Sequence, residues 1–70
     1  MKVQYVHVQL VPCDSRLCDN FVFAEGNLGV DDLHIITRDG FVTVNHLASD
    51  GARLGKTWPA SAIHVITTRL

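Results

Sequence analysis

The 70-residue sequence predicts a small all-β protein, a five-stranded barrel that forms one domain over residues 1–70. Two observations support this class. Apolar and polar residues alternate with the two-residue period of strands, and short turns containing glycine separate the apolar runs. A third observation excludes the main alternative, because no segment keeps a 3.6-residue helical period. Residues 33–70 carry the clearest pattern.

The first strand is expected over residues 2–11, where β-branched residues alternate with polar ones. Pro12 ends it, because proline cannot donate a hydrogen bond to a neighbouring strand. A polar loop follows, and the apolar run 21–23 predicts a second, short strand. The alternation gives the first strand a core face with Val6, Val8 and Leu10, and an outer face with Val3, Tyr5 and Val11.

Residues 33–37 and 41–46 predict a hairpin around Arg38-Asp39-Gly40. Asp-Gly between two apolar runs is a strong turn signal, because glycine accepts a positive φ. A second turn of the same type at residues 49–51 leads into a strand over residues 52–58. The final strand is expected over residues 63–68, with Ile63 and Val65 on its core face.

The segment Trp58-Pro59-Ala60-Ser61-Ala62 leads into this last strand. It resembles the short 3-10 turn, led by proline, that SH3-like and Sm-like barrels place before their last strand. The resemblance covers only this short stretch, so it implies a topology and not a family. The expected fold is therefore an all-β, five-stranded SH3-like or Sm-like small barrel with a short 3-10 turn before the last strand.

A narrower resemblance is to the plasmid-type (type II) dihydrofolate reductases, which are SH3-like chains of similar length. It rests on Asn20-Phe21-Val22-Phe23 and on Trp58-Pro59 with Ala62-Ile63. That family's substrate-binding run Val-Gln-Ile-Tyr before the proline is here Gly55-Lys56-Thr57-Trp58. Because the residues that would carry activity are replaced, the resemblance supports the barrel, and a reductase-like enzyme ranks third among the functions considered.

Composition and charge narrow the choice of function. The net charge is −1, without the basic excess typical of nucleic-acid-binding proteins. The apolar fraction of 47% is large for a chain near the lower size limit for independent folding, so we expect self-association or a bound partner. The sequence has no signal-peptide pattern and no apolar run of the roughly 18 residues that a membrane span needs. We expect a cytoplasmic protein.

The residues with candidate chemistry do not form a recognised motif. His7, His34 and His64 would share the outer face and could approach one another, but their spacing matches no compact zinc motif. Cys13 and Cys18 are expected to be free thiols in a reducing cytosol. The pair Asp31-Asp32 is interpreted as a solvated loop and not as a general acid–base pair. We therefore predict no catalytic residue, no metal site and no cofactor.

The outer face of the barrel is the expected working surface. Apolar residues that cluster outside a core usually mark an interface. Trp58 is interpreted mainly as an anchor of the last turn and secondarily as a ligand contact, because large aromatic residues dominate small cores. The predicted partner-binding residues are Tyr5, His34, Ile36, Trp58, His64 and Ile66.

We thus predict a non-enzymatic protein-binding module or inhibitor that acts by occupying a partner's surface and forms a homodimer. Chains this short are often encoded by phages or mobile elements. The alternative function is binding of single-stranded nucleic acid, with Trp58 and Tyr5 stacking on bases. In that alternative, the phosphate contacts come from Arg53, Lys56 and Arg69.

Overall fold

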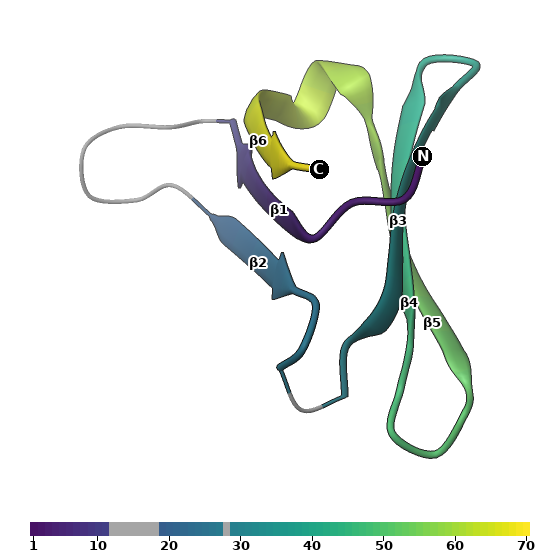
Figure 1. Cartoon of the computed structure of the whole chain (residues 1–70). Coiled ribbons are helices and arrows are strands. Elements are labelled where there is room, and N and C mark those ends of the chain that lie inside the picture. Colours follow the sequence, from purple (N-terminus) through teal and green to yellow (C-terminus); the bar gives the residue numbers. More distant parts are fainter. Residues whose placement is uncertain (12–18, 28) are drawn as a thin grey trace.

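The computed structural model describes residues 1–11, 19–27 and 29–70, and it confirms an all-β chain. The strands form two three-stranded antiparallel sheets, ordered β2-β1-β6 and β3-β4-β5, which lie opposite one another (Figure 1). The elements are β1 (Tyr5–Leu10), β2 (Asn20–Ala24), β3 (Asp31–Arg38), β4 (Phe41–Leu47), β5 (Arg53–Pro59), the 3-10 turn η1 (Ala60–Ala62) and β6 (Ile63–Arg69).

The number of strands and the way the sheets join differ from the prediction. The described chain has six strands, one at each of the six segments expected from the alternation and one more than a five-stranded barrel contains, and it does not close into one barrel. Residues 1–3 pair with β3: the backbone N–H of Val3 donates to the carbonyl of Leu33 at 3.0 Å, and that of Ile35 donates to the carbonyl of Met1 at 2.9 Å. The chain then bends at Gln4 and enters β1 in the other sheet. The N-terminal segment therefore ties the two sheets together.

The second link between the sheets is η1, which connects β5 to β6 and matches the predicted 3-10 turn. No ladder of backbone hydrogen bonds joins β2 to β5 in the described part of the chain. The assembly of sheets is therefore open on that side, where side chains of β2 and β5 make the contacts that the described residues show.

Both predicted tight turns are present. Asp39 and Gly40, between β3 and β4, have φ values of 53° and 79°, the two left-handed residues that define a type I′ hairpin turn. In the turn between β4 and β5, Gly51 has a φ of 87°, and its N–H donates to the carbonyl of Ala48 at 3.0 Å. Such turns suit the right-handed twist of the flanking strands, so they set the register of the sheet β3-β4-β5.

The core is small and draws on both sheets. Its partly buried rim includes aromatic residues from β2 and β5, among them Phe21, Phe23 and Trp58. Seven described apolar side chains are buried: Val3, Val6, Val8, Leu33, Ile35, Val42 and Val44.

Two assignments of faces were wrong, each for a backbone reason. Val3 is only 1% exposed, because the bend at Gln4 shifts the alternation between residues 1–3 and β1. In β6, Ile66 packs against the core whereas Val65 is 42% exposed. Gln9 pairs with Val65 and Leu10 with Ile63, so His64 is an extra residue in a β-bulge, and the bulge reverses the faces that follow it.

Candidate binding surfaces

The residues predicted to bind a partner are divided between several surfaces. His34 and Ile36 flank the buried Ile35 on β3, so they lie on the outer face of the sheet β3-β4-β5. Tyr5 lies on the other sheet, outside the buried Val6.

The remaining three predicted residues lie on neither of these outer faces as a group. His64 is exposed in the bulge of β6, whereas Trp58 and Ile66 pack against the core. The single face assumed from the alternation is therefore broken by the bulge and by the separation of the strands into two sheets.

The three basic residues of the nucleic-acid alternative are also apart. Arg53 and Lys56 lie three positions apart on β5, so their side chains leave opposite faces of the strand. The guanidinium of Arg69, at the end of β6, lies 5.7 Å from the ring centroid of Tyr5. These three cations do not line up as the basic groove that follows a phosphate backbone.

Trp58 is positioned as an anchor between the sheets. Its ring centroid lies 5.3 Å from that of Phe21 on β2, with the two planes tilted by 46°. The ammonium of Lys56 lies 5.0 Å from the centroid of the same Phe21 ring. The contact between β2 and β5 is therefore made by the aromatic pair of Phe21 and Trp58, with the Lys56 ammonium over the Phe21 ring.

Asp32 is at the centre of a charged cluster that the sequence did not predict. The register shifts between Asp31 and His34, where Asp32 adopts a φ of 49° in a bulge of β3. Its carboxylate accepts hydrogen bonds from Arg53 at 2.5 Å and from Lys2 at 3.3 Å. The expected solvated loop is therefore wrong: Asp31 and Asp32 both lie in β3, and Asp32 belongs to an ion-pair network.

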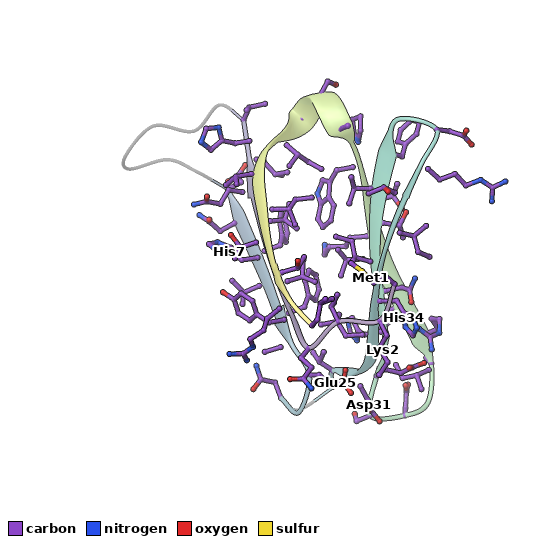
Figure 2. All side chains as sticks on the ribbon, turned by 45° about the horizontal axis from the view of Figure 1, so that its top comes forward. Met1, Lys2, His7, Glu25, Asp31 and His34 are labelled. Atoms are coloured by element: carbon purple, nitrogen blue, oxygen red, sulfur yellow. The ribbon has the colours of Figure 1, made fainter. Side chains whose placement is uncertain are left out.

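The network joins the N-terminus to both sheets. Lys2 also donates to both carboxylate oxygens of Glu25 at 3.2 Å, and Figure 2 shows Lys2, Glu25 and His34 at the same end of the molecule. Hydrogen bonds from Arg53 and Lys2 lower the pKa of the Asp32 carboxyl, and the hydrogen bond to Glu25 raises the pKa of the Lys2 ammonium. Because these side chains are exposed, solvent screens the network, and its main effect is to fix geometry.

The histidines do not gather into a metal site. His7 hydrogen-bonds through Nε2 to Oδ1 of Asn20 at 2.8 Å, and Figure 2 shows it far from His34. Within residues 1–11, 19–27 and 29–70, no group of three or more His, Cys, Asp or Glu side chains is arranged to hold a metal ion. Cys13 and Cys18, predicted to be free thiols, lie outside the described residues.

A groove lies beside the open side of the sheets, between β2 and β5. It has a volume of about 170 Å³. The side chain of Leu54 is 50% exposed there, and the ring of Phe23 lies 5.7 Å from that of His46. We call this hollow the β2–β5 groove, and its lining consists of Phe23, Val44, His46, Leu54, Gly55 and Lys56.

The edges of the sheets are a second candidate surface. In the described part of the chain, β5 pairs only with β4, and β6 pairs only with β1. Each strand therefore presents a row of backbone groups without a neighbouring strand. The sequence pattern predicts both strands correctly, but it does not indicate which strands lie at the edge of a sheet.

Comparison with known proteins adds no relative: no protein-family model, no curated protein and no solved structure matches the chain. Among the described residues there is also no helix of the length and apolar character needed to cross a membrane.

Proposed function

We propose that this chain is a non-enzymatic protein-binding module that acts in the cytoplasm by occupying a partner's surface and that also self-associates. The two sheets would be the halves of an open, SH3-like small barrel. The hairpins of β3-β4-β5 and the 3-10 turn before β6 support this assignment.

The observation that carries the proposal is the imbalance between buried and exposed apolar groups. Only seven described apolar side chains are buried. Small domains that leave apolar side chains outside the core are often stabilised by oligomerisation or by a partner. Eight large hydrophobic residues of the described segments remain exposed: Met1, Val11, Val22, Ile36, Phe41, Leu54, Val65 and Leu70.

We assign self-association to the free edge of β6. The strand Ile63–Arg69 contains no proline and no acidic residue, and Arg69 is its only charged residue unless His64 is protonated. Two copies paired antiparallel about Ile66 would place Val65 of each copy opposite Thr67 of the other, with no like charges facing at the centre. Such pairing would extend β2-β1-β6 into a continuous sheet across the dimer.

Sedimentation velocity over a range of protein concentrations tests this proposal. The variant Val65→Lys/Thr67→Lys places lysines opposite one another across the pair, so we expect it to sediment as a monomer where the parent protein sediments as a dimer. The control variant Val22→Lys/Ile36→Lys adds the same charge at exposed positions on β2 and β3 and is expected to leave the dimer intact. A parent protein that stays monomeric at all concentrations contradicts self-association.

A further inference from the structure

The strand β5 is the most exposed strand of the molecule. Every residue of Arg53–Pro59 except Trp58 is exposed. The strand lies at the end of the sheet β3-β4-β5, and in the part of the chain that the structure describes it has no partner beyond β4. An exposed strand edge of this kind can accept an extended peptide, whose backbone then supplies the missing hydrogen bonds.

The β2–β5 groove opens beside this edge. Leu54 and Lys56 are two residues apart, so they lie on the same face of β5 and both line the groove. The opposite wall is aromatic, because Phe23 on β2 contacts His46. The groove thus offers an apolar recess at Leu54 and a cation at Lys56, separated by the spacing of alternate residues in a strand.

The charge of the groove is not balanced within the described chain. Arg53 is paired with Asp32, whereas Lys56 has no carboxylate within ion-pair distance among the described residues and lies over the ring of Phe21. The strand itself contains two basic residues and no acidic residue. A bound group that supplies a carboxylate at Lys56 is therefore electrostatically favoured.

We propose that the β5 edge binds an extended segment of a partner protein that carries an apolar residue and an aspartate or glutamate two positions apart. The segment adds to β5 as a further strand, inserts its apolar side chain beside Leu54 and places its carboxylate at Lys56. Because alternate residues of the added strand face the same side, this spacing lets both side chains enter the groove. The inference rests on the proposed function and names the chemistry of the partner.

A second copy of the chain is a poorer occupant of this edge. Antiparallel pairing of two β5 strands about Lys56 would place the two ammonium groups opposite one another, and like charges in that position are destabilising. The self-association edge, β6, lacks such a charge at its centre. The two edges therefore have different occupants, β6 a second copy and β5 an acidic partner strand.

An array of immobilised, end-blocked octapeptides tests the assignment. The central positions hold Leu-x-Glu, Leu-x-Gln or Leu-x-Lys, and the other positions vary among Thr, Val, Ser and Tyr. We expect the protein to bind Leu-x-Glu peptides about two- to fivefold more tightly than their Leu-x-Gln counterparts, the gain of one exposed ion pair. Absence of binding to all peptides, or no preference for glutamate, overturns the inference.

Substitutions locate the preference in the groove. Lys56→Gln should abolish the preference for glutamate, and Lys56→Glu should transfer it to Leu-x-Lys. Arg38→Gln removes an exposed cation from the other end of the hairpin β3-β4 and should change nothing. A glutamate preference that survives Lys56→Gln overturns the inference. An oligo-dT probe tests the nucleic-acid alternative: if the parent protein retains it and Lys56→Gln abolishes that retention, the inference is also overturned.

The sedimentation experiment separates this inference from the proposed function. If the array fails while the dimer forms and is disrupted by Val65→Lys/Thr67→Lys, only the role of the β2–β5 groove is wrong. If the protein neither binds a peptide nor self-associates, both the inference about the groove and the proposed function are wrong.

Discussion

The matched pair Leu33→Ala and Leu54→Ala tests the described core with one chemical change at two sites. Leu33 is 0% exposed and lies where residues 1–3 join β3, whereas Leu54 is 50% exposed on the edge strand β5. Truncating a fully buried leucine typically costs about 2–5 kcal/mol of unfolding free energy, because apolar contacts are lost and a cavity remains. The same change at an exposed position typically costs about 0.5 kcal/mol or less.

These magnitudes are large for a chain of this size. At about 0.05–0.15 kcal/mol per residue, 70 residues give a total unfolding free energy of about 3.5–10 kcal/mol. Leu33→Ala should therefore remove between a fifth of the stability and all of it. With a urea dependence of about 1 kcal/mol per M, the unfolding midpoint should fall by about 2 M or more.

Urea unfolding followed by tryptophan fluorescence measures this difference directly. Trp58 is the only tryptophan, and its contact with Phe21 joins the two sheets, so its emission reports their separation. The parent protein and both variants are compared at one protein concentration, because self-association stabilises the folded state. Equal shifts for Leu33→Ala and Leu54→Ala would refute the assignment of the core.

Three further predictions follow from single features of the fold. Ile66→Asp should lower the unfolding midpoint in urea far more than Val65→Asp, because the bulge turns Ile66 to the core and Val65 to solvent. Equal effects of the two substitutions would place the bulge elsewhere. The lowered pKa of Asp32 implies a stabilisation that is fully present above its ordinary value of 3.8 and is lost as the pH falls through the folded-state pKa. In urea unfolding, Asp32→Asn should therefore lose less stability than the parent protein when the pH falls from 5 to 2. An unchanged acid profile would contradict the role of the cluster. Gly40→Ala should cost about 1–2 kcal/mol in the same unfolding assay because of its φ of 79°, and a neutral effect would argue against the type I′ turn.

Local sequence patterns predicted the strands and turns well, because their causes are local. Asp39-Gly40 forms a left-handed pair in the β3–β4 turn, as a short Asp-Gly link between apolar runs predicts. The proline-led segment before β6 forms the predicted 3-10 turn at Ala60–Ala62. Each of these features depends on the φ preferences and hydrogen-bonding limits of a few neighbouring residues.

The faces and the ion-pair cluster could not be predicted in the same way. Alternation assigns faces only while the register is unbroken, and the bulge at His64 and the bend at Gln4 interrupt it without a distinctive residue pattern. The partners of Asp32 come from segments far away in the chain, since Lys2 is 30 and Arg53 is 21 positions away. Such contacts depend on which strands become neighbours, which the sequence pattern alone does not specify.

Hydrogen–deuterium exchange at low and high protein concentration tests most directly whether the strand edges are the working surface. The proposed dimer predicts that exchange of the backbone amides in β6 slows more at high concentration than exchange in the central strand β4, which slows only as far as association stabilises the whole fold. Adding a Leu-x-Glu peptide should slow exchange in β5 in the same manner. If neither concentration nor peptide changes exchange in β6 or β5, the free edges bind nothing and the account is contradicted.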